Sequence, residues 1–219
     1  HGTTYELVPA SLHNWGFTNI HTVPEQSIPD GDFPTVASAN PEEPAAFKMA
    51  LDLARKIDAD LAMACDPDGD RIGIAVKNDA GEWTLLNGNQ TNIIFTEYII
   101  RRKKELNQLK GGEYTVKTIV TTELIKDIAE KNHIICYDVY TGFKWIADVI
   151  RKEGGEKFIG GGEESFGYMP GAFTRDKDGV SATSLMAEIA AWVKMQNKTL
   201  YSFLKEIYAK YGFSQERMI

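Results

Sequence analysis

The feature that most limits the possible folds is the alternation of strand-like and helix-like segments in the second half of the sequence. Short apolar runs of strand length alternate with longer segments in which apolar residues recur every three or four positions. The predicted strands cover residues 115–120, 134–138 and 157–160, and the predicted helices cover 122–132, 143–152, 179–195 and 199–210. Such alternation is typical of a mixed or mostly parallel sheet covered by helices on both faces.

The first half of the chain has a less regular pattern. Apolar residues at helical spacing before Gly16 predict a helix over residues 4–15, and a short strand is predicted at Ile20–Val23. Five prolines between residues 24 and 44 indicate a long surface loop. The remaining predicted elements are a helix over 42–56, strands over 61–65 and 72–76, and a partner strand near 83–85.

A helix signal at Thr91 restarts the pattern, so we place a domain boundary near residue 87. The expected fold class is α/β, with two tandem three-layer α/β/α domains and mixed, mostly parallel sheets. The first domain would span residues 1–87 and the second residues 88–219.

Composition excludes several classes of function. The 31 acidic and 24 basic side chains give a net charge of −7, which argues against a nucleic-acid-binding surface. No run of about 20 apolar residues indicates a membrane span. The two cysteines, Cys65 and Cys136, lie in strand-like apolar runs, so buried reduced thiols are expected rather than a disulfide. These features favour a cytoplasmic protein.

An acidic loop between two predicted strands is the strongest candidate for a metal site. Asp66, Asp68 and Asp70 occupy every second position, which lets three carboxylates converge on one cation. Hard oxygen donors without histidine favour Mg²⁺ over zinc. Arg71 follows directly and could pair with a phosphate group. An acidic β-turn without a metal stays open as an alternative, whereas an EF-hand is disfavoured because Lys77 occupies the position of its last glutamate.

Three further segments carry polar groups suited to a ligand. Gly160–Gly167 is a glycine run containing Glu163, Glu164 and Ser165, which can approach and hydrogen-bond sugar hydroxyls. It lacks the Lys-Ser/Thr ending of a phosphate-binding P-loop. The other two segments are Thr141-Gly142-Phe143-Lys144 and Asp176-Lys177-Asp178-Gly179. On local grounds Lys144 is better read as an exposed lysine at the start of a helix, and Asp176–Gly179 could equally be a charged surface turn.

Taken in order, these motifs resemble those of the α-D-phosphohexomutase superfamily of phosphoglucomutases and phosphomannomutases. Asp66–Arg71 is similar to its Asp-x-Asp-Gly-Asp-Arg metal loop, and Gly162–Ser165 to its Gly-Glu-x-Ser sugar loop. The Thr-Gly-x-Lys and Lys-Asp-Gly segments also have counterparts there. So do His1-Gly2-Thr3 and Leu86-Asn87-Gly88, which resemble turns near the starts of the second and third family domains.

The resemblance implies specific roles. Asp66, Asp68 and Asp70 would hold Mg²⁺, while Arg71, Lys144 and Lys177 would act on the phosphoryl group or on the hydroxyl proton. Glu163, Ser165, Gly142 and Lys144 would bind the phosphosugar. Which lysine would serve as the general base is open. The implied reaction interconverts sugar 1-phosphate and 6-phosphate through a phosphoserine enzyme and a sugar bisphosphate intermediate.

Two parts that this chemistry requires are missing from the 219 residues, namely the phosphoserine loop and the phosphate-binding loop of the first and fourth family domains. We therefore expect a fragment that folds but is inactive alone. Three alternatives stay open: a phosphopentomutase-type substrate, a non-catalytic module that binds a cation and a sugar, and a phosphatase with an aspartate nucleophile.

Overall fold

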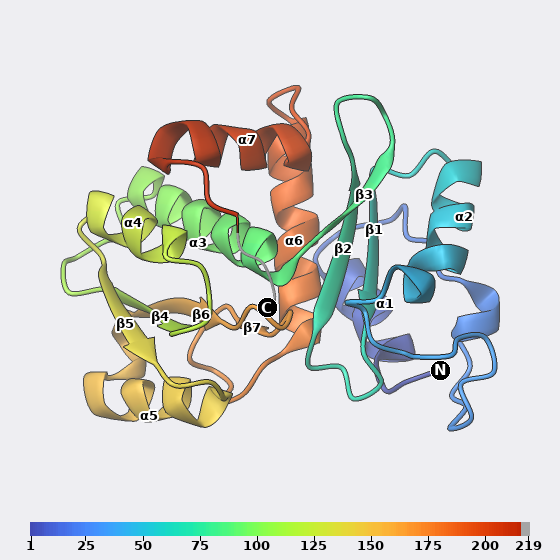
Figure 1. Ribbon diagram of the computed structural model, residues 1–219, viewed down its shortest axis with the longest axis horizontal. Helices are drawn as coiled ribbons and strands as arrows, with labels where there is room; N and C mark the ends of the chain where they lie inside the picture. Colours follow the sequence, from blue (N-terminus) through green and yellow to red (C-terminus); the bar gives the residue numbers. More distant parts are fainter. Residues whose placement is uncertain (216–219) are drawn as a thin grey trace.

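The computed structural model describes residues 1–215, and its strands form two separate sheets (Figure 1). The first sheet has the order β1-β2-β3, and both of its strand pairs are antiparallel; its strands are β1 (Leu61–Cys65), β2 (Ile72–Lys77) and β3 (Trp83–Leu86). The second has the order β5-β4-β6-β7, with strands β4 (Tyr114–Thr118), β5 (Ile135–Val139), β6 (Phe158–Gly162) and β7 (Tyr168–Met169). Strand β4 pairs in parallel with β5 and β6, whereas β7 is antiparallel to β6.

Helices cover both sheets, so the predicted α/β class is confirmed (Figure 1). The α-helices are α1 (Thr4–Asn14), α2 (Lys48–Lys56), α3 (Gly88–Glu105), α4 (Leu124–Lys131), α5 (Phe143–Glu153), α6 (Gly179–Lys194) and α7 (Leu200–Tyr211). Short 3₁₀ turns lie at Pro24–Gln26, Pro44–Phe47 and Gly155–Lys157. Within residues 1–215, none of the helices is both long enough and apolar enough to cross a membrane.

The largest hydrophobic core joins the two sheets. Ile72 and Ile74 of β2 pack in one buried cluster with Phe95 of α3 and Met186 of α6. Helices from the second half of the chain therefore cover one face of the first sheet. The opposite face of that sheet packs against Phe47 and helix α2. The continuous core fixes the loops of one sheet relative to those of the other.

Helix α5 covers the other face of the second sheet. Phe143, Ile146 and Ile150 project from α5 onto Tyr114 and Val116 of β4. These three helical residues recur at spacings of three and four, the pattern that predicted this helix from the sequence. The position of α5 matters because its first turn carries the Gly142–Lys144 segment.

Two predictions about individual elements were wrong. The predicted strand at Ile20–Val23 is not a strand, because residues 17–23 have no strand partner. Helix α3 begins at Gly88, one turn before the predicted signal at Thr91, because Asn87 and Gln90 form a capping box. The Asn87 side chain accepts from the Gln90 amide at 2.8 Å, and the Gln90 side chain accepts from the Asn87 amide at 3.0 Å.

Both cysteines are unpaired thiols, as predicted. Burial raises the pKa of Cys65 to about 11 and that of Cys136 to about 12. Neither thiol is therefore ionised at neutral pH, which is consistent with packing roles rather than nucleophilic ones.

Candidate functional site

The acidic loop connects β1 to β2 and curls around the carboxylate of Asp66. One oxygen of Asp66 accepts hydrogen bonds from the backbone amides of Asp70 and Arg71, both at 3.0 Å. This turn brings the carboxylates of Asp66, Asp68 and Asp70 together, with one oxygen from each within 4.8 Å of the others. The predicted convergence of three carboxylates is therefore present in the structure.

The electrostatics of this cluster fit a divalent cation. Asp66 is only 9% exposed, and burial together with the neighbouring carboxylates raises its pKa to about 6. A bound cation would offset both the burial and the mutual repulsion of the carboxylates. Three carboxylate oxygens suit Mg²⁺ or Ca²⁺, and water or a phosphate oxygen can complete the shell of either ion.

Arg71 lies beside the acidic loop but is already engaged. Its Nη1 donates to Glu42 at 3.2 Å, and its Nε lies 3.7 Å from Asp66 and 3.8 Å from Asp70. A phosphate group could replace Glu42 as the partner of the guanidinium. The sequence analysis did not identify Glu42, which lies in the long proline-rich loop.

Lys177 links the acidic loop to the second half of the chain. Its ammonium lies 2.7 Å from Asp70 and 5.3 Å from the ring centroid of Phe143. Burial alone would lower the pKa of Lys177, but the contact with Asp70 outweighs it, and the pKa is raised. In this state Lys177 is a proton donor or a positive charge rather than a general base.

Backbone contacts also hold the acidic loop and the start of β2 against the Asp176–Gly179 segment and the glycine-rich segment. The Gly179 amide donates to the Gly69 carbonyl at 3.0 Å, and the Ile72 amide donates to the Phe166 carbonyl at 3.1 Å. Arg71 and Gly167 form an isolated antiparallel bridge. Loops from the two sheets thus meet in one region, although they lie far apart in the sequence.

The glycine-rich segment contacts the Thr-Gly-x-Lys segment. One carboxylate oxygen of Glu163 accepts from the Gly142 amide at 2.6 Å, and Glu163 is only 8% exposed. Gly142 has a φ of 110°, which lets the chain turn into α5 with its amide directed at Glu163. Ser165 is half-buried two residues further on.

Lys144 lies outside these contacts. It is exposed in the first turn of α5, and its ammonium lies 5.3 Å from the ring centroid of Trp145. In the part of the chain that the structure describes, Lys144 forms no ion pair. The fold places it near Gly142 without directing it at the acidic loop.

Residues beneath the glycine-rich segment were missed by the sequence analysis. The Asn92 side chain donates to the Glu163 carbonyl at 2.7 Å, and the hydroxyls of Thr118 and Thr121 donate to Glu164 at 3.2 and 3.1 Å. The Glu164 carboxylate thus accepts from two threonine hydroxyls, whereas the Glu163 carboxylate accepts from the backbone amide of Gly142. No local pattern in the sequence distinguishes these supporting residues.

Comparison with known proteins agrees with this arrangement. Residues 1–81 match "Phosphoglucomutase/phosphomannomutase, alpha/beta/alpha domain II", and residues 87–211 match domain III of the same family. The chain belongs to the phosphoglucomutase/phosphomannomutase family. A phosphoglucomutase from Staphylococcus aureus is 37% identical over all 219 residues, which span only 39% of that relative. The chain therefore corresponds to about two fifths of the length of this family member.

Solved structures of family members show the same fold. A phosphomannomutase described as putative, from Thermus thermophilus, aligns with a TM-score of 0.62 at 25% identity, covering 79% of this chain and 36% of the other. Parafusin, a phosphoglucomutase from Paramecium, aligns with a TM-score of 0.64 at 22% identity, covering 85% and 32%.

Proposed function

We propose that this chain is the central part of a magnesium-dependent phosphosugar mutase that interconverts hexose 1-phosphate and hexose 6-phosphate. The observation that carries the proposal is the junction between the acidic loop and the glycine-rich segment, which the Ile72–Phe166 hydrogen bond and the Arg71–Gly167 bridge hold together, with the Lys177 ammonium beside Asp70. Family membership supports the same class of reaction. The reaction would proceed through an enzyme phosphoserine and a sugar bisphosphate.

In this proposal the acidic loop neutralises the phosphoryl group. Asp66, Asp68 and Asp70 would hold Mg²⁺, which supplies Lewis-acid stabilisation of phosphate charge. Arg71 would exchange Glu42 for a phosphate oxygen, and Lys177 would add a second positive charge beside Asp70. Phosphoryl transfer depends mostly on such positioning and charge neutralisation.

The glycine-rich segment would orient the sugar. Glu163 and Ser165 would bind two hydroxyl groups, and the Gly142 amide would fix the Glu163 carboxylate by the 2.6 Å hydrogen bond. Lys144 would reach the phosphate at the far end of the sugar from the exposed side of α5. Protonated Lys177 could return a proton to a sugar oxygen as the phosphoryl group leaves.

The domain limits and the cellular setting belong to the same proposal. We infer two domains, residues 1–87 and 88–219; the family matches, which end at residue 81 and begin again at residue 87, support a division in this region. A longer polypeptide that contains this chain would supply the phosphoserine and the remaining phosphate contacts. We place that protein in the cytoplasm. The partial coverage of the S. aureus relative supports this inference.

Phosphorus NMR of glucose 1-phosphate with Mg²⁺ and a trace of glucose 1,6-bisphosphate tests the proposal. A longer polypeptide that contains this chain should form glucose 6-phosphate, whereas the 219-residue chain alone should not. Mannose and ribose phosphates in parallel reactions identify the preferred sugar. Turnover by the isolated chain, or none by the longer protein with any of these sugars, would contradict the assignment.

A further inference from the structure

A buried asparagine on α3 contacts the backbone of the glycine-rich segment. Asn92 is 2% exposed, and its side-chain amide donates to the carbonyls of Gly88 and Glu163 at 2.9 and 2.7 Å. Both partners are carbonyl oxygens, which only accept hydrogen bonds, so the nitrogen of the Asn92 amide has to face them. Asn92 therefore joins the first turn of α3 to the residue that follows β6.

The side-chain oxygen of Asn92 is buried and, among residues 1–215, lacks a hydrogen-bond partner. It lies close against β6, since a Cβ on Gly162 would be 2.0 Å from it. An unsatisfied buried oxygen lowers stability and offsets part of what the two hydrogen bonds of the nitrogen contribute. Asn92 is therefore better explained by the position that it gives Glu163 than by stability alone.

Glu163 is held at both its backbone and its carboxylate. Its carbonyl accepts from Asn92, and its amide donates to the Gly167 carbonyl at 3.0 Å. Its Oε1 accepts from the Gly142 amide at 2.6 Å. Within residues 1–215, no hydrogen bond reaches the other carboxylate oxygen, Oε2. The carboxylate is therefore confined, and one oxygen is left to accept from a ligand hydroxyl.

Buried hydroxyls hold the residues on either side of Glu163. The Thr115 hydroxyl donates to the Gly160 carbonyl at 2.7 Å, and the Glu164 carboxylate accepts from the two threonines described above. Among the described side chains, Asn92 alone donates to Glu163 itself. The position of the Glu163 backbone thus depends on Asn92 more than on any other side chain.

We propose that Asn92 is a positioning residue for the carboxylate of Glu163, an inference that rests on the proposed function. By holding the Glu163 carbonyl, Asn92 fixes the backbone from which the carboxylate projects. Oε2 is then in place for a hydroxyl of the phosphosugar before the ligand arrives. A carboxylate that is held in advance loses little conformational freedom on binding, so the affinity is higher. Asn92 itself does not touch the ligand.

Asn92→Ser removes the contact with Glu163 and keeps the contact within the helix. A serine in a helix donates to the carbonyl four residues earlier, which here is that of Gly88. Its side chain is too short to reach Glu163 as well. The variant therefore isolates the hydrogen bond that the proposal concerns.

Asn132→Ser is the matched control. The Asn132 amide also donates to the carbonyl four residues earlier, that of Ile128, at 2.8 Å. Its second partner is likewise distant in the sequence, the Tyr211 hydroxyl at 2.9 Å. The same substitution at Asn132 thus removes an equivalent pair of contacts away from the glycine-rich segment.

Amide NMR of the ¹⁵N-labelled chain provides two measurements. The first needs no ligand: in Asn92→Ser, the Gly142 amide should exchange with solvent about tenfold faster relative to the amides of β4. The second is a titration with glucose 1,6-bisphosphate at saturating Mg²⁺, in which Asn92→Ser should weaken binding by about tenfold. Mg²⁺ affinity should stay the same, and Asn132→Ser should change none of these values.

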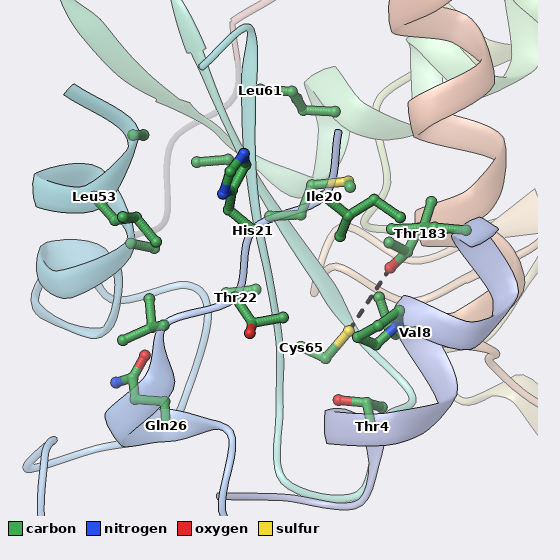
Figure 2. Close-up of a pocket in the computed structure, with 18 of the residues that line it drawn as sticks. Thr4, Val8, Ile20, His21, Thr22, Gln26, Leu53, Leu61, Cys65 and Thr183 are labelled. Carbon is green, nitrogen blue, oxygen red and sulfur yellow. Dashed lines mark hydrogen bonds between the residues drawn. The ribbon is translucent and has the colours of Figure 1, made fainter. Parts of the chain in front are cut away.

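Binding of the bisphosphate elsewhere is detected separately. A cavity of about 500 Å³ lies beside β1, and Figure 2 shows Leu53, Leu61 and Cys65 in its wall. Of the described residues that line it, none belongs to α3 or to Gly160–Gly167. The signals of Leu53 and Leu61 should therefore not follow the bisphosphate titration. A binding curve seen only at these signals would contradict the proposed function.

The results for the two asparagine variants separate this inference from the proposed function. If the unsubstituted chain binds the bisphosphate and Asn92→Ser binds it equally tightly, the inference fails while the proposed function stands. A uniform rise in exchange throughout β4 and Gly142, or equal effects in Asn132→Ser, would also overturn the inference. If the Gly142 amide responds as expected but the unsubstituted chain binds no bisphosphate, the proposed function fails, and the ligand named here fails with it.

If Asn92→Ser does not fold by circular dichroism, the unsubstituted chain decides the question. Coupling between two sites is reciprocal, so a contact that raises ligand affinity is itself strengthened by the ligand. The bisphosphate should therefore slow exchange of the Asn92 side-chain amide protons by about tenfold and leave those of exposed Asn197 unchanged. Exchange at Asn92 that the bisphosphate does not alter would overturn the inference.

Discussion

Substitution Asp68→Asn should make the metal-free protein more stable while weakening its binding of Mg²⁺. Asp68 is the exposed member of the three-carboxylate cluster, and no backbone amide depends on it. Unit charges 4.8 Å apart in water repel by about 0.9 kcal/mol. Asp68 has two such neighbours, but Lys177 and Arg71 offset part of the repulsion. We expect a net gain of about 1 kcal/mol without metal, less at high salt.

Thermal unfolding measures both effects. For a protein of this length, 1 kcal/mol corresponds to a rise in Tm of roughly 2–4 °C, measured in EDTA at low salt. Mg²⁺ at 100 times its Kd should stabilise the unsubstituted chain by about 2.7 kcal/mol. The same concentration should shift the Tm of the Asp68→Asn variant by less than half as much.

Asp32→Asn is the matched control, because Asp32 is an exposed aspartate in the proline-rich loop, away from the cluster. It should change neither the Tm in EDTA nor the shift caused by Mg²⁺. A lower Tm for Asp68→Asn in EDTA combined with a full Mg²⁺ shift would refute the reasoning. That result would mean that the carboxylates neither repel one another nor share a cation.

Three further predictions concern single residues. Because the pKa of Asp66 is about 6 and the metal needs its ionised form, Mg²⁺ affinity should fall as pH is lowered, by about tenfold per unit below pH 6 in calorimetric titrations. Glu97→Gln should lower the free energy of unfolding in urea by about 1–3 kcal/mol, because Glu97 is buried and paired with Arg101; exposed Glu105→Gln should cost under about 0.5 kcal/mol. Gly142→Ala should cost about 1–3 kcal/mol in the same assay, since φ is 110°, whereas Gly31→Ala in open space should be neutral.

Local patterns in the sequence were sufficient to predict most elements of the fold. Helix α5 and strand β2 were predicted well because their side-chain periodicity is set by one neighbouring surface. The two-residue strand β7 was missed because only its pairing with Gly161 and Gly162 defines it. The antiparallel pairing in the first sheet likewise depends on which strands lie side by side. The periodicity of apolar residues along one strand does not reveal its neighbours.

In the candidate site, too, features within one loop could be predicted from the sequence, whereas contacts between distant segments could not. The aspartate cluster could be predicted because its three members lie within five residues of one another in a single loop. The Lys177–Asp70 contact joins two distant segments, and only the resemblance to a known family pointed to Lys177. Glu42 and Asn92 carry no local signature, since each acts through a partner far along the chain.

The central claim is that the acidic loop and the glycine-rich segment form one site for a phosphosugar and a divalent cation. An amide NMR titration of the ¹⁵N-labelled chain with glucose 1,6-bisphosphate, with and without Mg²⁺, tests it most directly. Signals of residues 66–71, 141–144 and 163–167 should shift together along one binding curve. Glu163→Gln should lower the affinity for the bisphosphate that this curve gives. Shifts confined to one of these segments, or a curve that neither Mg²⁺ nor Glu163→Gln alters, would contradict the claim.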